Sequence, residues 1–428
     1  MKRRAFLGLS GRAAGGVLLS GWSMAPAKAA ASAKVLIIGG GFAGSSCALQ
    51  LRRINPRMQV TLVDPDEIYT TCPMSNGALV GQRDMQSLRV TRRGLVSAGV
   101  VYVRDQVAAL DTAARRARLA GGGELAYDRV VLATGIRMLW GKIDGYTETA
   151  ALRMPHAWQA GAQTEILAAQ IRALADGGVI AISVPAGPMR CPPGPFERAS
   201  LIAAHLRPVK PRCKILIFDA NNRFPRQDEF SSAWRELYPG MIEWISVVDG
   251  GAVQRVDPER MMLINAGGEH RVDIANIIPP QAPAQLAVQA GLASDHGWCP
   301  VNPLTFESTS AEQTYVIGDS CIADPMPKAA SAAHSQALQC AAAISASLAG
   351  QEPAPAVLDS VCYSSLSTKT ALSIHGRFRA GAAGMEQLAT TLEVKASPAE
   401  EAARADAWYR HTVRQSFGEG ADLAGRSA

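Results

Sequence analysis

The sequence predicts an α/β protein built from two βαβ units of the Rossmann type and a smaller C-terminal α+β domain. Two continuous apolar runs, 34–38 and 178–184, have the composition of strands buried on both faces of a parallel sheet. Each is followed by a loop, a helical stretch and a further strand that ends in an acidic residue, Asp64 or Asp219. From about Leu358 the apolar residues alternate instead, as in half-exposed strands. At 428 residues the chain is also too long for one ordinary core.

The first 29 residues have the pattern of an export signal. Arg3 and Arg4 precede a short, glycine-rich apolar run, and Ala27-Lys28-Ala29 supplies a small-x-small cleavage pattern. We interpret residues 1–29 as a twin-arginine signal peptide rather than a membrane anchor, which predicts a periplasmic protein. No later segment has the roughly 18 unbroken apolar residues that a membrane span needs. We therefore expect no transmembrane segment in the mature chain.

The first unit carries a dinucleotide-binding fingerprint. After the strand at 34–38, Gly39, Gly41 and Gly44 have the GxGxxG spacing, with Ala43 inside it. Such glycines allow a tight turn, let the backbone approach a pyrophosphate and bring the next helix close to the sheet. Asp64 ends the second strand twenty residues beyond Gly44, where a carboxylate can hydrogen-bond a ribose hydroxyl. Together these features predict a bound dinucleotide.

Two later segments favour FAD over NAD as that dinucleotide. The strand that begins at Asp128 runs into Thr134 and Gly135, which resemble the turn where flavin disulfide reductases leave their FAD domain. A strand from Thr314 ends in Gly318 and Asp319, which resemble the pair that binds the flavin ribityl chain in those proteins. Pro327 is expected in the first turn of an alanine-rich helix that runs from Lys328 to about Leu348. The N-terminus of this helix, Lys328 included, would stabilise an anionic reduced flavin.

The second unit lacks the glycine fingerprint. Its turn, 185–195, has no GxGxxG spacing, and its prolines remove backbone donors that a pyrophosphate would use. Met189 and Arg190 would further obstruct a nucleotide. We expect no functional NAD site there. The predicted division is an FAD-binding domain over 33–150 and 290–357, a second Rossmann-like domain over 151–289 and an interface domain over 358–428.

The mature chain resembles the flavoprotein subunit of flavocytochrome c sulfide dehydrogenase, a relative of sulfide:quinone oxidoreductase in the glutathione-reductase-like FAD/NAD(P) superfamily. The motifs that carry the resemblance occur in family order in all three regions: GGGFAG, YTTCPMSN, CPPGPFER, VIGDS, MPKAA, VCYS and WYR…SFG. The resemblance implies that the protein oxidises sulfide. It also implies that the two electrons pass through FAD to a c-type cytochrome subunit with one or two haems.

Three catalytic residues follow from the resemblance. Cys191 and Cys362 correspond by position to a redox disulfide beside the flavin, and Glu197 corresponds to an active-site glutamate. Sulfide can open a disulfide by thiol–disulfide exchange, which leaves a persulfide and a thiolate, and a carboxylate can move the proton. The alternatives are a purely structural bridge for the two cysteines and a solvated first-turn helix carboxylate for Glu197.

Cys72 is a lone cysteine shortly after the first fingerprint. Its residue type leaves three interpretations open: half of a disulfide, an inert buried thiol, or an attachment point for a cofactor. The resemblance implies the third, because Cys72 matches the cysteine that bonds through sulfur to the flavin 8α-methyl group in that family. A thiolate is a competent nucleophile for this addition.

The remaining cysteines and the histidines have no assigned chemistry. Cys47, in the helix after the fingerprint, and Cys321, beyond Asp319, are interpreted as packed thiols; Cys213, Cys299 and Cys340 have no family role. No CxxC or CxxCH occurs, and the seven histidines lack metal-ligand spacing, so no metal site is expected. His334 is expected to pack on its helix. The net charge of +6 is not gathered in a basic block, which argues against nucleic acid as a partner.

The C-terminal segment bears on the electron acceptor. Residues 373–379 and 392–395 alternate like strands, and Ser397 precedes a helix that is expected to run to about Ser416. This helix is rich in Ala, Glu and Arg with little apolar face, which favours a soluble acceptor over the membrane-seated helices of the quinone enzymes. Trp408 and Tyr409 either line the flavin–cytochrome junction or simply pack. A sulfide:quinone oxidoreductase and a non-catalytic sulfur-carrier subunit remain the alternative functions.

Overall fold

The computed structural model describes residues 33–381, 384–388 and 397–420. The predicted signal peptide, 1–29, and the predicted strand at 392–395 lie outside these residues. Within the described ranges, no helix combines the length and the apolar character of a membrane span.

The first unit forms a five-stranded parallel sheet with the strand order β20-β9-β1-β2-β5. The strands are β1 (Lys34–Ile38), β2 (Gln59–Val63), β5 (Val101–Val103), β9 (Arg129–Leu132) and β20 (Thr314–Val316). The predicted central strand is confirmed, since Leu36 and Ile37 of β1 are both buried although they point to opposite faces. β20 joins the edge of β9 from far along the chain, so two separate segments build this sheet.

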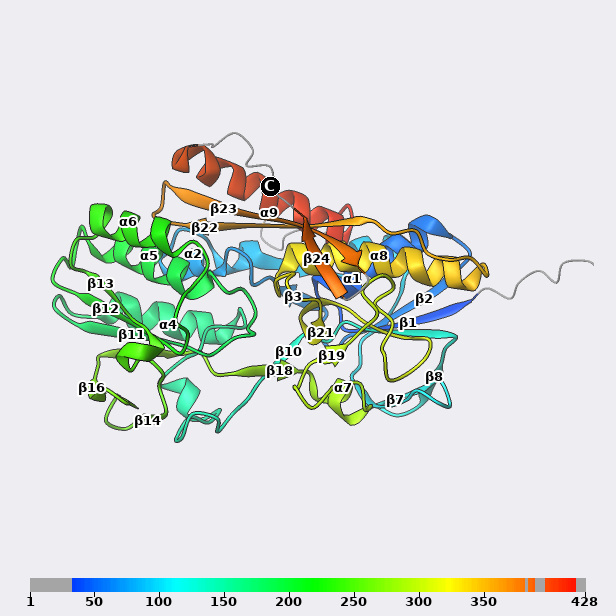
Figure 1. The fold of residues 1–428 in the computed structure, drawn as a ribbon, viewed down its shortest axis with the longest axis horizontal. Coiled ribbons are helices and arrows are strands. Elements are labelled where there is room, and N and C mark those ends of the chain that lie inside the picture. The colour runs from blue at the N-terminus through cyan, green and yellow to red at the C-terminus, as the bar shows by residue number, and fades with distance from the viewer. Residues whose placement is uncertain (1–32, 382–383, 389–396, 421–428) are drawn as a thin grey trace, which may run out of the picture. The chain divides into compact units, whose positions relative to one another are not determined.

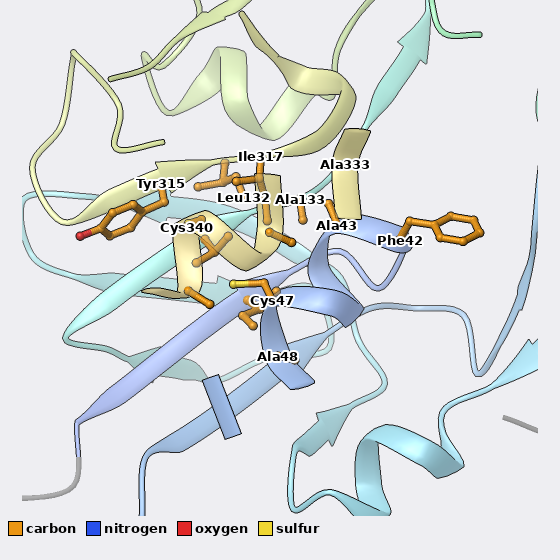
Figure 2. Packing of buried hydrophobic residues seen from close by; sticks show 14 of the residues in the cluster. Phe42, Ala43, Cys47, Ala48, Leu132, Ala133, Tyr315, Ile317, Ala333 and Cys340 are labelled. Carbon is orange, nitrogen blue, oxygen red and sulfur yellow. The ribbon is translucent and has the colours of Figure 1, made fainter. Parts of the chain in front are cut away.

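Two helices pack together beside this sheet (Figure 1). α1 (Phe42–Ile54) follows β1, and α8 (Ala330–Leu348) lies along it. Small side chains meet where they pack: Figure 2 shows Ala43 and Cys47 of α1 close to Ala333 and Cys340 of α8. Cys47 is fully buried there, which confirms the prediction of a packed thiol.

The predicted start of the long helix is wrong by two residues. α8 begins at Ala330 with the extended Ala329 as its N-cap, so neither Pro327 nor Lys328 is helical. Lys328 is held outside the helix by two contacts: its carbonyl oxygen accepts from the backbone N–H of Cys191 at 2.8 Å, and its ammonium donates to the carbonyl oxygen of Cys321 at 2.7 Å. These tertiary contacts outweigh the local preference of proline for a first helical turn.

The second unit forms a four-stranded parallel sheet with the order β13-β12-β11-β17. The strands are β11 (Val179–Val184), β12 (Lys214–Asp219), β13 (Ile242–Ile245) and β17 (Ile274–Ile277). Its helices are α4 (Ala162–Ala173), α5 (Gly194–Leu206) and α6 (Gln227–Leu237). The antiparallel pair β10 (Ile136–Met138) and β18 (Gln281–Pro283) joins the two sheet regions (Figure 1).

The C-terminal region is an antiparallel meander covered by one helix. β22 (Val357–Ser365), β23 (Ala371–Gly381) and β24 (Gly384–Leu388) pair in sequence order. α9 (Pro398–Phe417) begins with a capping box between Ser397 and Glu400, which confirms the predicted start.

The expectation that α9 has little apolar face is wrong. Ala405, Tyr409, Val413 and Phe417 recur at four-residue spacing, are all buried, and lie on the side of α9 that packs against α1 and β23. Tyr409 therefore belongs to the core, and its hydroxyl lies 2.8 Å from the Thr71 hydroxyl. The apolar face of α9 is used inside the protein.

Short elements fill the connections. The helices are α2 (Ser75–Leu79), α3 (Arg93–Ser97) and α7 (Gln285–Gln289), with 3₁₀ turns at Met85–Leu88, Ala150–Leu152, Val247–Asp249 and Gly318–Ser320. The strands are β3 (Ile68–Thr70), β4 (Arg89–Thr91), β6 (Val107–Asp111), β7 (Arg116–Leu119), β8 (Glu124–Ala126), β14 (Arg255–Asp257), β15 (Met262–Asn265), β16 (Gly268–Arg271), β19 (Cys299–Pro300) and β21 (Cys321–Ile322).

Candidate functional site

The glycine turn after β1 has the geometry that the fingerprint requires. Gly39 has a φ of +100°, a conformation that side chains disfavour. A Cβ on Gly44 would lie 1.9 Å from the carbonyl oxygen of Gly39, so only glycine lets α1 approach the turn. The N-cap residue Gly41 has no side chain to bond the first-turn N–H groups. These donors are therefore left for an anion at the positive end of the helix.

Asp64 lies beside this turn but is held by protein groups. Its Oδ2 accepts from the backbone N–H of Gly40 at 2.6 Å, and its Oδ1 forms an ion pair with Arg92 at 2.9 Å. The Arg92 guanidinium also donates to the carbonyl oxygens of Gly40 and Asp66. Arg92 thus fixes both the carboxylate and the turn, a role that the sequence did not reveal because Arg92 follows a separate strand.

A cavity of about 530 Å³ extends from the glycine turn to the predicted catalytic cysteines. Most of the predicted site residues line it: Gly39, Gly41, Ala43, Asp64, Cys72, Thr134, Gly135, Cys191, Glu197, Asp319 and Cys362. They come from α1, α5, β22, the 3₁₀ turn Gly318–Ser320 and the loops that follow β1, β2 and β9, among others, so the fold brings these distant segments to one space. Trp408 also lines the cavity, with its ring 5.5 Å from that of Tyr363.

Three predicted cofactor-binding residues do not line the cavity. Gly44 provides the close packing described above. Gly318 has a φ of +75°, and a Cβ there would lie 3.0 Å from the Cβ of Ala43, so it allows close packing on α1. Lys328 instead lines a separate, smaller groove, and its ammonium lies 3.9 Å from the centre of the Trp298 ring.

Cys191, from the loop before α5, and Cys362, from β22, both line the cavity. Cys191 has a φ of +52°, and its sulfur lies where a Cβ on Gly194 would be only 3.0 Å away. Burial, followed by the nearby Cys362 and Glu197 charges, raises the pKa of Cys191. Burial likewise raises the pKa of Cys362 to about 11. All cysteines are unbonded thiols in the structure, so the Cys191–Cys362 disulfide stays a prediction.

Glu197 is bound by protein donors rather than by solvent. Its Oε2 accepts from the side-chain amide of Asn76 at 2.8 Å, and its Oε1 accepts from the backbone N–H of Ser365 at 3.0 Å. Burial raises its pKa, while these hydrogen bonds act in the opposite direction. The alternative of a fully solvated carboxylate is therefore wrong. After burial, the Glu197 charge contributes to the raised pKa of both cysteine thiols.

Two arginines near the cysteines were missed or misread in the sequence. Arg190 was expected to obstruct the second nucleotide turn, but its side chain lines the first cavity and donates to the carbonyl oxygen of Trp158. Although burial acts in the opposite direction, nearby negative charge, including that of Asp319, raises the pKa of Arg190. Arg198 is buried and holds Asn76 at 3.0 Å and Asn276 at 2.7 Å. Met189 and Arg190 are neighbours in the sequence, but Met189 lines a second, smaller groove and Arg190 lines this cavity, which no local sequence pattern predicts.

The second unit has a smaller groove of about 280 Å³ at the corresponding strand ends, lined in part by Pro188, Met189 and Asp219. Asp219, the counterpart of Asp64, already accepts from Asn221 at 2.7 Å and from the Trp244 indole at 3.0 Å. These contacts account for the acidic strand end without a nucleotide.

Cys321 and His334 are packed in the interior. Cys321 is buried, and its sulfur donates to the carbonyl oxygen of Gly318 at 3.2 Å, as expected for a packed thiol. His334 lies 2.8 Å from the Ser46 hydroxyl, and burial lowers its pKa to about 4. In the described part of the chain, no group of His, Cys, Asp and Glu side chains could hold a metal ion.

The donor set of the cavity fits FAD. The unpartnered first turn of α1 suits a pyrophosphate, and the start of α8, with Ala329, Ala330 and Ala333 in the lining, points a second helix N-terminus into the cavity. Asp319 adds a carboxylate that can accept from hydroxyl groups. The hydroxyl of Thr134, which also lines the cavity, is buried without a partner in the described structure. These groups match an elongated ligand with a pyrophosphate, hydroxyls and an anionic ring.

Comparisons with known proteins agree with this cofactor. A family model described as "Sulfide dehydrogenase [flavocytochrome c] flavoprotein chain, central" matches residues 164–279, and that of the pyridine nucleotide-disulphide oxidoreductases matches 33–181. The sulfide dehydrogenase flavoprotein chain of Chlorobaculum thiosulfatiphilum is 49% identical over 43 residues, which are 10% of this chain and 90% of that sequence. The mitochondrial sulfide:quinone oxidoreductase of Mus musculus is 22% identical over 310 residues, 71% of this chain and 68% of the relative.

Solved structures agree on the fold. The sulfide:quinone oxidoreductase of Aquifex aeolicus superposes with a TM-score of 0.73 at 16% identity, covering 92% of this chain and 93% of that chain. A putidaredoxin reductase, solved in complex with putidaredoxin, gives 0.64 at 20% identity over 81% and 82% of the two chains. The predicted α/β fold of the FAD/NAD(P) superfamily is confirmed. The chain belongs to the family of the flavoprotein chains of flavocytochrome c sulfide dehydrogenase, FAD-dependent oxidoreductases related to the sulfide:quinone oxidoreductases.

Proposed function

We propose that this chain oxidises sulfide at Cys191 and Cys362 and passes the two electrons, one at a time, to a c-type cytochrome subunit. The observation that carries the proposal is the convergence of Cys191, Cys362 and Glu197 on the cavity that also holds the glycine turn. FAD, when bound in this cavity, supplies an acceptor that takes two electrons together and releases them singly.

The two cysteines perform the sulfur chemistry as a disulfide. Hydrosulfide attacks one of the two sulfur atoms and breaks the S–S bond, which leaves a persulfide on that cysteine and a thiolate on the other. Glu197 takes the proton that sulfide loses and returns it to a departing thiolate, since its carboxylate acts on both thiols. When the disulfide forms again, the sulfane sulfur leaves as sulfur or polysulfide, and the two electrons given up by the cysteine sulfur atoms would be taken up by FAD held in the cavity.

Burial explains why this chemistry needs a base. It raises the pKa of both thiols, so the neutral forms are favoured in the reduced pair. A thiolate that leaves the disulfide is therefore readily protonated, and proton transfer to and from Glu197 sets which sulfur is reactive. The arginines of the cavity, Arg190 and Arg198, supply positive charge near these anions.

We also propose that FAD is attached covalently through Cys72. The support is the position of Cys72 in the lining of the same cavity, close to the positive charge of Arg190, together with the family motif around it. A denaturing gel imaged for flavin fluorescence tests this proposal. Fluorescence that migrates with the polypeptide is expected, and its complete loss would contradict covalent attachment.

Reduction by sulfide is the test of the enzymatic proposal. Anaerobic addition of sulfide should bleach the flavin rapidly in the wild-type protein, and Cys191→Ser should retain flavin but lose this bleaching. A wild-type flavin that sulfide does not reduce would leave the chain as a sulfur carrier or redox-binding subunit instead of a catalyst.

A sulfide:quinone oxidoreductase is the second candidate, because the longer matches in sequence and in structure are to those enzymes. Against it, the apolar face of α9 is buried inside the protein and is not available to a membrane surface. Reoxidation of the reduced flavin by ferricytochrome c but not by decylubiquinone would support the cytochrome proposal. The reverse result would overturn it.

We place the protein in the periplasm, exported by the twin-arginine route. The support is the sequence pattern of residues 1–29 alone. The mass of the mature N-terminus and fractionation of cells that carry Arg3→Lys and Arg4→Lys together would test it. Retention of the paired variant in the cytoplasm is the expected result.

A further inference from the structure

Asn76 links the segment that carries Cys72 to the start of α5, which follows Cys191. It lies in α2, four residues after Cys72, and is 8% exposed. Its Nδ2 donates to Oε2 of Glu197 at 2.8 Å and to the carbonyl oxygen of Gly194 at 3.2 Å. Its Oδ1 accepts from Nε of Arg198 at 3.0 Å. Both the nitrogen and the oxygen of its side-chain amide are therefore hydrogen-bonded to residues in the first turns of α5, the helix that follows Cys191.

The chemistry of Arg198 fixes which way the amide points. A guanidinium can only donate hydrogen bonds, so the oxygen of Asn76 must face Arg198 and the NH₂ group must face Glu197. Arg198 is itself immobile, because it is 2% exposed and also donates to the carbonyl oxygens of His156 at 3.0 Å and Ala157 at 2.6 Å. The donor that Asn76 presents to Glu197 is thus set by a rigid neighbour.

The surroundings of Glu197 are built for a carboxylate. Its partners are the Asn76 side-chain amide from α2 and the backbone N–H of Ser365 from β22, and both are donors. The charged and titratable groups that act on it or respond to it are Arg198 of α5, Cys191 of the preceding loop and Cys362 of β22. Burial favours the neutral acid and raises the pKa of Glu197, and the two donors and Arg198 offset part of that effect.

We propose that Asn76 is a positioning residue that holds the Glu197 carboxylate ionised and aimed between Cys191 and Cys362. The inference rests on the proposed role of Glu197 in proton transfer and adds to it the group that sets the ionisation of Glu197. Without the Nδ2 donor, Oε2 would lose its hydrogen bond from Asn76 in a partly buried site, and the neutral acid would become more stable relative to the carboxylate.

Two substitutions change this donor in different ways. Asn76→Ala removes it. Asn76→Asp keeps the shape but places a second carboxylate about 3 Å from Oε2 of Glu197, where two carboxylates cannot both be ionised. Since Arg198 would pair with the new carboxylate, the shared proton should reside on Glu197.

The expected result is a shift of the acid limb in the pH profile. The rate of sulfide-driven flavin bleaching, followed by stopped-flow absorbance, should fall at a higher pH in Asn76→Ala, by about one to two pH units for one hydrogen bond to a charged group. Asn76→Asp should shift it further in the same direction. The sign follows because Glu197 acts as a base only when ionised, and a higher pKa of Glu197 removes that form at higher pH.

Controls separate this role from a structural one. Asn302→Ala removes an asparagine whose Oδ1 accepts from Leu304 N at 2.9 Å outside the cavity, and it should leave the profile unshifted. In a Glu197→Gln background the Asn76→Asp change should cause no further shift. Loss of rate that is uniform across pH, with lower flavin content per chain, would instead show that Asn76 only supports the fold and would overturn the inference.

A second measurement keeps this inference distinct from the proposed function. Infrared difference spectra report the carbonyl stretch of a protonated carboxyl, and Glu197→Gln identifies the band of Glu197. In Asn76→Asp this band should persist to higher pH than in the wild type, whether or not sulfide reduces the flavin. An unchanged titration would overturn the inference, whereas a wild-type flavin that sulfide cannot reduce would overturn only the proposed function.

Discussion

Gly44→Ala should deprive the protein of most of its flavin. Gly44 lies in the first turn of α1, directly behind the glycine turn that is assigned to the pyrophosphate. The added Cβ would lie 1.9 Å from the carbonyl oxygen of Gly39 and 3.2 Å from the Cβ of Ala133. The first of these atoms belongs to the backbone, so no side chain can rotate to relieve the collision.

The structure gives the size of the disturbance. Contacts of a Cβ below 3.0 Å are essentially absent from real proteins, so α1 or the turn must move by about 1 Å. α8 packs along α1 and resists that movement. Overpacking of this kind costs about 1–3 kcal/mol. If the cost falls on the ligand-binding conformation, the affinity for FAD before its covalent attachment drops about tenfold to hundredfold, so fewer chains acquire the cofactor.

Flavin absorbance per chain after purification measures the effect, with thermal unfolding as a second readout. Gly77→Ala is the matched control, because a Cβ on Gly77 of α2 would find its nearest neighbour at 3.5 Å, an ordinary contact. We expect Gly77→Ala to keep its flavin. A Gly44→Ala protein with full flavin content and unchanged unfolding would refute the assignment of this turn.

Three further predictions follow from the contacts. Cys72→Ala should still bind flavin at the unaltered glycine turn but release it on denaturation; flavin that stays with the denatured variant would place the attachment elsewhere. Arg198→Leu should lower the free energy of unfolding by about 3–5 kcal/mol in urea, because it leaves several buried acceptors unpaired; the exposed Arg207→Leu should change it little, and equal effects would contradict the buried-network account. Burial lowers the pKa of His156 to about 4, so the unfolded chain gains a proton below about pH 6.5 while the folded chain does not. Stability should therefore fall between pH 6.5 and 4, by at most about 3 kcal/mol from this group; an unfolding midpoint with the same pH dependence in His156→Asn would assign that fall to other groups.

The family motifs are short and local, so the sequence alone located most of the site. The turn after β1, the strand that leads to Asp319 and the capping box of α9 each depend on neighbours within a few residues. Backbone conformation and hydrogen bonding at this range follow from residue type. Prediction from residue type failed at the start of α8, because the tertiary contacts of Lys328 outweighed the local preference of Pro327 for a first helical turn.

By itself, then, the sequence determined the class of fold, the presence of a dinucleotide turn and the residue types available for sulfur chemistry. Only the tertiary structure decided that Arg190 faces the first cavity, that the apolar face of α9 is buried, and that Asn76 bonds Glu197. The physical reason is separation along the chain: Asn76 and Glu197 lie 121 residues apart, and Ser365 lies 168 residues beyond Glu197. A hydrogen bond between such groups depends on how whole helices and strands pack. Packing between distant segments produces no periodic pattern in the sequence from which the contacting residues could be predicted.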